Sequence, residues 1–253
     1  MTLIDYFDRI SIVHLRARTD RYHALVCELR RMGIEITNKK VSIPDAPMPA
    51  DANSFPGKGM YGSFLSHLDI LQSARKNDLQ SVWVLEDDAI FSRRFVREQH
   101  KIVEFLSRNE WDICYFGHTL TDELRSLPLG FPRYSGAFYW AHCYAVHARI
   151  LPRLITYIEE TIERPRGDPR GGKMYIDAAY TLFRKFNPDV VTLVANPVLS
   201  LQRGSQSSLG EGYWYDRNAL ARPAVRLARL MRDECWRWTG WTYGGAAPRN
   251  LGD

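Results

Sequence analysis

Three consecutive acidic residues, Glu86, Asp87 and Asp88, follow a short apolar run in the sequence. The run, residues 81–85, is rich in β-branched and aromatic side chains and predicts a buried strand. Adjacent carboxylates repel one another unless a cation lies among them, and open α/β sheets bind ligands at the carboxyl ends of their strands. Mg²⁺ and Mn²⁺ prefer such oxygen ligands and usually share their coordination with phosphates. The stretch therefore predicts a metal–diphosphate site, although a solvated acidic turn that caps the next helix fits it equally well.

The composition indicates an ordinary globular protein, with 253 residues, 45% of them hydrophobic and 25% charged. No apolar stretch reaches the roughly 20 residues that span a bilayer, and the N-terminus lacks the basic-then-apolar layout of a secretory signal. The four cysteines form no C-x-x-C pair, which argues against a zinc ribbon or a disulfide scaffold and favours a reducing compartment. We therefore expect a cytoplasmic protein.

The residues before the acidic triplet predict a βαβ opening, and so a parallel sheet. Residues 10–15 alternate as a strand, residues 19–32 carry an apolar helical face that stops at Gly33, and residues 34–37 predict a second strand. Anions commonly bind where a strand passes into a helix. Three arginines lie there, with solvated surface arginines as the alternative: Arg16, Arg18 and Arg21.

Two loops frame the rest of the domain. A Pro- and Gly-rich stretch at residues 44–58 is long enough to be functional or mobile, and the helix after it carries Ser66 and His67 near its start. Residues 201–208 predict a second loop, dense in hydrogen-bond donors. Between the loops the patterns predict helices at 92–106, 152–162 and 175–186, and strands at 111–116, 136–146 and 190–194.

The C-terminal part differs in character. We expect a domain over residues 1–215 and a basic amphipathic tail over residues 216–253, in which arginines alternate with apolar residues at 222–241. Such a helix lies either on an anionic membrane surface or on the body of the protein with its arginines in water. Because the basic residues are concentrated in this stretch, without an aromatic-rich recognition surface, nucleic-acid binding has little support.

Five segments, taken in order, resemble the motifs of glycosyltransferase family 25, the bacterial lipooligosaccharide galactosyltransferase-like group. They span about residues 10–209 and comprise residues 10–21 (a strand and an arginine-bearing helix start), 62–67 (small residues, then Ser-His), 84–88 (hydrophobic-E-D-D), 175–177 (an Asp before an apolar helix) and 196–208 (Asn-Pro, Gln, Ser). The chain departs from the family at residues 141–144, where Ala-His-Cys-Tyr replaces a small Gly-Thr pair before a Gly-Tyr strand. This strand is expected to border the acceptor site.

The resemblance implies a GT-A-type fold, a Rossmann-like α/β sandwich with a mostly parallel central sheet. It also implies inverting transfer of a hexose, galactose or glucose, from a UDP-sugar to a glycan or lipid-linked acceptor in lipopolysaccharide, lipooligosaccharide or surface polysaccharide synthesis. Mn²⁺ or Mg²⁺ neutralises the departing diphosphate in such a reaction, and a carboxylate or histidine deprotonates the acceptor hydroxyl. We expect the protein in the cytoplasm or peripherally on the inner face of the cytoplasmic membrane.

The family's acid-x-acid metal ligation makes Glu86 and Asp88 the predicted metal ligands. Asp177 is the candidate general base, although an Asp at a helix start is most often a cap, and His67 and His142 compete for this role. The predicted donor-binding residues are Arg16, Arg18, Arg21, Ser66, Asp87, Gln202 and Ser207.

Two other functions use the same residues. A nucleotidyltransferase also needs carboxylates, metal and phosphates, but the sequence lacks the Gly-rich loop with paired basic residues that such enzymes carry after the first strand. A catalytically silent GT-A-like binding protein would keep the fold without the reaction, and the departure at residues 141–144 favours it.

Overall fold

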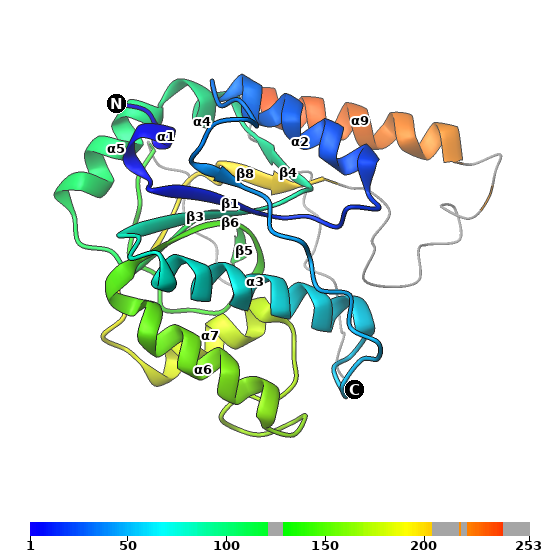
Figure 1. Cartoon of the computed structure of the whole chain (residues 1–253). Coiled ribbons are helices and arrows are strands. Elements are labelled where there is room, and N and C mark those ends of the chain that lie inside the picture. The colour runs from blue at the N-terminus through cyan, green and yellow to red at the C-terminus, as the bar shows by residue number, and fades with distance from the viewer. Residues whose placement is uncertain (121–128, 204–217, 219–221, 240–253) are drawn as a thin grey trace.

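The structure is a computed structural model that describes residues 1–120, 129–203, 218 and 222–239 (Figure 1). Its centre is a six-stranded sheet in the order β2-β1-β3-β6-β5-β7. The strands pair in parallel except β6, which is antiparallel to both of its neighbours. Their bounds are Arg9–Val13 (β1), Val41–Ser42 (β2), Ser81–Glu86 (β3), Ile113–Leu120 (β5), Phe138–His147 (β6) and Thr192–Val194 (β7). The predicted α/β sandwich with a mostly parallel central sheet is confirmed.

Helices cover both faces of this sheet (Figure 1). Trp83 and Leu85 of β3 belong to one buried cluster and Val82 and Val84 to another, as the alternation of a strand requires. One cluster includes residues of α1 (Leu3–Tyr6), α2 (Thr19–Arg31), α4 (Arg93–Arg97) and α5 (Gln99–Arg108), and the other of α3 (Lys58–Lys76), α6 (Leu151–Glu163) and α7 (Ile176–Phe186). Because both faces are buried, the strand ends are where polar side chains can meet a ligand.

The predicted βαβ opening is present, but the prediction of its second strand is wrong. Residues 34–37 form no strand. Gly33, at φ +74°, ends α2, and the Ile34 N–H donates to the carbonyl of Leu29 at 2.9 Å. This contact at the helix end buries Ile34 in the core, so the apolar residues after Gly33 close the helix instead of forming a strand. β2 follows later and pairs in parallel with β1.

The acidic stretch lies between two strands. β3 ends at Glu86, a turn at residues 87–88 follows, and β4 (Ala89–Phe91) pairs antiparallel with β8 (Ser200–Gln202) in a small second sheet. The prediction of a loop from residue 201 is therefore wrong at its start, because β4 provides a partner strand. In this pairing Gln202 lies opposite Ala89, which brings its side chain next to the acids.

Two further elements differ in extent from their predictions. The helix predicted at 92–106 is interrupted at Glu98 and forms α4 and α5. The strand predicted at 111–116 continues to Leu120 as β5, with shifts in its register against β6 on either side of Gly117. Such irregularities bend a strand without ending it. The strands predicted at 136–146 and 190–194 and the helices predicted at 152–162 and 175–186 are confirmed with shifted boundaries.

The helix predicted in the C-terminal stretch is present as α9 (Arg222–Thr239), which lies beside α2 (Figure 1). Trp236 and Asp233 are buried on its inner side, and Arg237 pairs with Glu28 of α2. Its outer side exposes large apolar side chains, namely Leu227, Leu230, Met231 and Trp238. Over the described residues, no helix, α9 included, is long and apolar enough to cross a bilayer.

Candidate functional site

The three acids at the end of β3 lie inside the protein. Asp87 and Asp88 are 5% and 4% exposed, and the Asp87 N–H donates to the carbonyl of Val13 at 3.1 Å, which ties the turn to the end of β1. The next helix, α4, takes its cap from Ser92, whose hydroxyl accepts the Phe95 N–H. The alternative of a solvated acidic turn that caps the next helix therefore does not describe this stretch.

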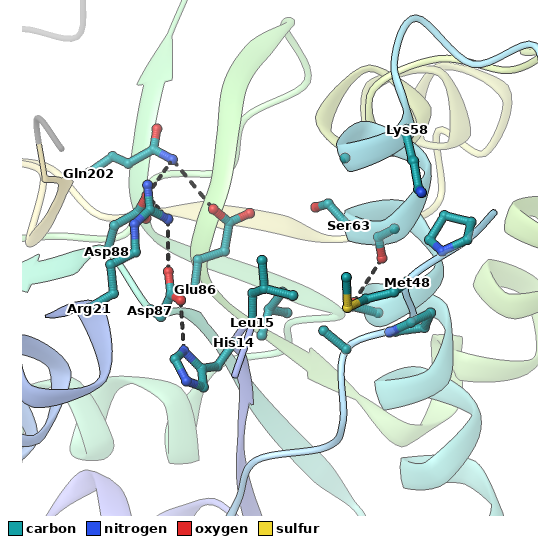
Figure 2. A pocket seen from close by; sticks show the side chains of 17 residues that line it. His14, Leu15, Arg21, Met48, Lys58, Ser63, Glu86, Asp87, Asp88 and Gln202 are labelled. Atoms are coloured by element: carbon teal, nitrogen blue, oxygen red, sulfur yellow. Dashed lines mark hydrogen bonds and ion pairs between the residues drawn. The ribbon is translucent and has the colours of Figure 1, made fainter. Parts of the chain in front are cut away.

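A cavity of about 360 Å³ adjoins the acids (Figure 2). One wall is formed by the end of β1, by Arg21 of α2 and by Gln202, and the opposite wall by residues 46–49 and the first turns of α3 with Lys58 and Ser63. This volume lies in the range of small-molecule sites, which is about 300–1,000 Å³. The structure thus places the acids in a pocket that can take a ligand.

Asp87 is held by two basic side chains. Its Oδ2 atom lies 2.8 Å from His14 Nδ1 and its Oδ1 atom accepts from Arg21 Nη1 at 2.9 Å. The same Nη1 atom is 3.0 Å from Asp88 Oδ2. The guanidinium therefore bridges two buried carboxylates and offsets part of their mutual repulsion. Because both oxygens of Asp87 bind protein groups, Asp87 positions Arg21 and His14 in the wall of the cavity.

Glu86 and Asp88 converge on one amide. Gln202 Nε2 lies 3.4 Å from Glu86 Oε2 and 3.3 Å from Asp88 Oδ2. Burial, together with the charge of Glu86, raises the pKa of Asp88 to about 7, against the lowering effect of Arg21. Burial also acts to raise the pKa of Glu86, but the hydrogen bond and charge of His67, with His142 and Arg21, bring it below its usual value. Asp88 is thus the carboxyl group of this pair that titrates near neutral pH.

The chemistry of this pair fits a divalent cation shared with a substrate. The Oδ1 atom of Asp88 is buried and has no hydrogen-bond partner among the described residues, so it is an oxygen that a cation can satisfy. In the described part of the chain, no group of three or more His, Cys, Asp or Glu side chains is arranged to hold a metal by itself. A site of one or two carboxylates completed by phosphate and water is the usual arrangement for Mg²⁺.

Ser66 and His67 of α3 lie next to these acids. Ser66 lines the cavity, and its hydroxyl donates to the carbonyl of Gly62 at 2.8 Å. His67 is fully buried behind Glu86, with Nε2 3.3 Å from Glu86 Oε1 and Nδ1 2.8 Å from the hydroxyl of Tyr144. The imidazole thus contacts the acidic pair from inside the protein.

Asp177 stands at the start of α7 and binds the backbone of β6. Its Oδ2 atom accepts the N–H of Trp140 at 2.9 Å, and its Oδ1 atom accepts that of Ala178 at 2.8 Å. Trp140 has φ +70°, a conformation that is costly for a bulky residue and concentrates at functional sites. Burial raises the pKa of Asp177, and the charge of Glu86 adds to this effect. Asp177 therefore lies within electrostatic reach of the acids, outside the cavity lining itself.

His142, the third candidate base, is fully buried in β6. Burial lowers its pKa, opposed by the charge of Glu86. The imidazole packs so closely on Gly117 of β5 that a side chain at that position would overlap its ring. This packing encloses the imidazole inside the sheet.

The other predicted donor-binding residues are more scattered. Arg16 is exposed and pairs with Asp45 at 2.5 Å, at the rim of a second cavity of about 330 Å³ that also includes His14 and Tyr22. Arg18 donates to Asp20 through Nε and Nη2, both at 2.9 Å. Ser207 lies outside the described residues. The structure therefore brings Arg21, Ser66, Asp87 and Gln202 to the cavity with Glu86 and Asp88.

Two of the basic residues that line the pocket were not predicted from the sequence. His14 lines both cavities and is oriented by Asp87, and Lys58 begins α3. His14 directly follows β1, so the rule that ligands bind at strand ends could have identified it. Lys58 ends the loop that was expected to be functional or mobile, but nothing in its local sequence distinguishes it from a surface lysine.

The α/β sandwich carries its acidic pair at the strand ends, where open α/β sheets bind their ligands. Residues 47–166 of this chain match the model of "Glycosyltransferase family 25 (LPS biosynthesis protein)". The matched segment contains the Ser66-His67 and Glu86–Asp88 motifs, and it confirms the resemblance found in the sequence. The match covers somewhat less than half of the chain and supports assignment to a glycosyltransferase family.

Solved structures give weaker likenesses. A glycosyltransferase involved in the glycosylation of the major capsid of PBCV-1 is 12% identical and covers 78% of this chain and 94% of its own, with a TM-score of 0.46. Mouse xyloside xylosyltransferase 1 is 11% identical over 72% of this chain and 83% of its own, with a TM-score of 0.40. A197 from STIV is 11% identical over 81% and 99%, with a TM-score of 0.39. Scores this low carry no weight for function.

Proposed function

We propose that this protein is a metal-dependent, inverting glycosyltransferase that moves a hexose from a UDP-sugar to a glycan or lipid-linked acceptor. The observation that carries the proposal is the pair of Glu86, which is partly buried, and Asp88, which is buried. Both line a ligand-sized cavity, and both belong to the segment that matches the family. Its chemical basis is the leaving group, since a nucleoside diphosphate needs its developing negative charge neutralised.

The described residues support binding of such a donor. Glu86 and Asp88 would hold Mn²⁺ or Mg²⁺, and the bound cation would supply charge neutralisation for the departing diphosphate. On the opposite wall, Lys58 adds a positive charge at the amino end of α3, where backbone N–H groups favour anions. The cavity thus offers positive groups on one side and cation-binding oxygens on the other.

Asp177 is our candidate general base. In the transfer, an acceptor oxygen bonds to the anomeric carbon, the bond from that carbon to the diphosphate breaks with inversion, and the hydroxyl proton passes to the base. Burial raises the pKa of Asp177, which makes its carboxylate a better proton acceptor. His67 and His142 are both fully buried, which disfavours both for contact with an acceptor, whereas Asp177 is partly exposed.

A binding and hydrolysis experiment tests the proposal. Purified protein should bind UDP in the presence of Mn²⁺ and slowly hydrolyse one UDP-sugar, and Asp88→Asn should lose both activities while circular dichroism shows an intact fold. Screening UDP-, GDP- and CMP-sugars by thermal shift, with and without Mn²⁺, identifies the donor class because a ligand that binds the folded form raises Tm. Protein that binds no nucleotide with metal, and cleaves no nucleotide-sugar, would contradict it.

α9 is the proposed membrane contact. Four of the nine exposed large hydrophobic side chains in the described residues lie on this one helix, namely Leu227, Leu230, Met231 and Trp238. Exposed arginines, Arg226 and Arg232, accompany them. A helix with an apolar outer side and basic residues suits the surface of an anionic bilayer. On this basis we propose that the enzyme binds peripherally to the inner face of the cytoplasmic membrane, where lipid-linked acceptors would be available.

A further inference from the structure

A buried chain of hydrogen bonds leads from the acidic pair into the core. Glu86 Oε1 lies 3.3 Å from His67 Nε2, His67 Nδ1 lies 2.8 Å from the Tyr144 hydroxyl, and that hydroxyl lies 2.8 Å from the hydroxyl of Tyr180. The chain joins β3, α3, β6 and α7. His67, Tyr144 and Tyr180 are fully buried. It therefore connects two elements that line the pocket, β3 and α3, to β6 and α7, which do not line it.

The chemistry of the groups sets the direction of these bonds. An ionised carboxylate only accepts, so His67 Nε2 carries a hydrogen and donates it to Glu86. In the neutral imidazole Nδ1 then accepts from Tyr144, and Tyr144 in turn accepts from Tyr180. Burial raises the pKa of both phenols, so both hydroxyls keep their protons. Each of these three hydrogen bonds is then donated in the direction of Glu86.

Ring packing fixes the histidine as well. The rings of His67 and Tyr144 are stacked, with centroids 5.8 Å apart and planes at 22°. Tyr144 meets Tyr180 edge-on at 5.4 Å. The stacked ring and the hydrogen bonds of both nitrogens therefore fix the orientation of the imidazole. As a result, Oε1 of Glu86 is engaged from inside the protein, while Oε2 lies beside Gln202, as Asp88 does.

We propose that His67, Tyr144 and Tyr180 form a positioning relay that holds Glu86 with Oε1 toward the core and Oε2 toward the cation. The inference rests on the proposed function for the role of Glu86 and adds residues that act through it. Some groups hydrogen-bond a metal-ligating carboxylate on the side away from the metal. Their removal typically lowers metal affinity about 10–100-fold. His67 is then a positioning residue and not the general base.

The structure provides a matched control. Tyr115 belongs to the same buried cluster and stacks on Tyr144 with centroids 5.7 Å apart, but its hydroxyl has no hydrogen-bond partner among the described residues. Tyr115→Phe and Tyr144→Phe therefore remove the same atom from neighbouring sites, and only the second breaks the relay. Tyr180→Phe removes its last member.

Calorimetric titration of UDP-saturated protein with Mn²⁺ gives the test. We expect Tyr144→Phe to weaken Mn²⁺ binding about tenfold or more, Tyr115→Phe to bind as wild type, and His67→Gln, which keeps a donor, to bind more tightly than His67→Leu. Equal binding by Tyr144→Phe and wild type, with Tm unchanged, would overturn the relay. Equal losses in the two Tyr→Phe variants would also overturn it, since packing would then explain both.

A second readout separates this inference from the proposed function. In metal-free protein, ¹⁵N NMR of the His67 ring should show the hydrogen on Nε2, and Tyr144→Phe should shift the Nδ1 resonance while Tyr115→Phe leaves it in place. A hydrogen on Nδ1 alone, or no response to Tyr144→Phe, contradicts the relay. Failure of the wild type to bind Mn²⁺ and UDP contradicts the proposed function, and the NMR result still decides the relay.

Discussion

Arg21 and Asp88 form an ion pair inside the candidate site, with Nη1 3.0 Å from Oδ2 and side chains that are only 12% and 5% exposed. The same guanidinium also binds Asp87. Arg21 therefore offsets part of the negative charge of these acids, and Glu86 and Asp88 would hold the metal ion.

Arg21→Met should destabilise the protein strongly. Removing one partner of a buried pair leaves an uncompensated charge and costs about 3–5 kcal/mol. We expect a loss of about 3 kcal/mol in the free energy of unfolding by urea. Arg18→Met is the control, because its partner Asp20 is 65% exposed and such pairs contribute about 1 kcal/mol or less. Equal losses in the two variants would show that the bridge is not what stabilises this turn.

Binding of Mn²⁺ should depend on the protonation of Asp88. Because burial and the charge of Glu86 raise its pKa to about 7, binding below that pH must displace a proton. The apparent association constant should then rise about tenfold per pH unit up to pH ~7 and level off above it. Titration at about pH 6 in buffers of different ionisation enthalpy should detect about one proton released per cation. Binding without proton release would refute this.

Asp177→Asn should lower kcat and leave the binding of UDP and Mn²⁺ nearly unchanged. Loss of a general base lowers kcat about 10²–10⁴-fold, while binding of UDP with Mn²⁺ should remain within about twofold because Asp177 does not line the donor cavity. Steady-state kinetics and calorimetry measure the two quantities. If kcat survives the substitution, Asp177 serves only to hold the backbone of Trp140.

The outer side of α9 should control membrane binding. The double variant Leu227→Gln, Met231→Gln should sediment less with vesicles of phosphatidylglycerol than wild type does, and neither should sediment with phosphatidylcholine alone. Phe186→Gln is the matched control, since Phe186 is also exposed, at 47%, but lies on α7. Donor binding should be unchanged in all variants. Equal sedimentation of wild type and the double variant would exclude α9.

The features that could be predicted were local ones. The run into Glu86 is a continuous apolar strand that ends in acids, and both properties are visible within a few residues. The family resemblance placed Gln202 among the donor-binding residues, but local patterns could not predict its approach to the acids. That approach depends on the pairing of β4 with β8 across more than a hundred residues. Tyr144 and Tyr180 resemble ordinary core positions until their hydroxyls are placed 2.8 Å apart. Ile34 misled the prediction because an apolar contact at a helix end resembles the start of a strand.

Glu28 of α2 links α9 to the helix that carries Arg21. This buried carboxylate accepts the N–H of Phe91 at 3.1 Å and pairs with Arg31, Arg203 and Arg237. It lies on α2, as Arg21 does, and the rise of a helix puts the two about 10 Å apart along the axis. α9 is thus ion-paired to the helix that carries Arg21 to the acids. The proposed membrane contact and the proposed donor pocket therefore both depend on the position of α2.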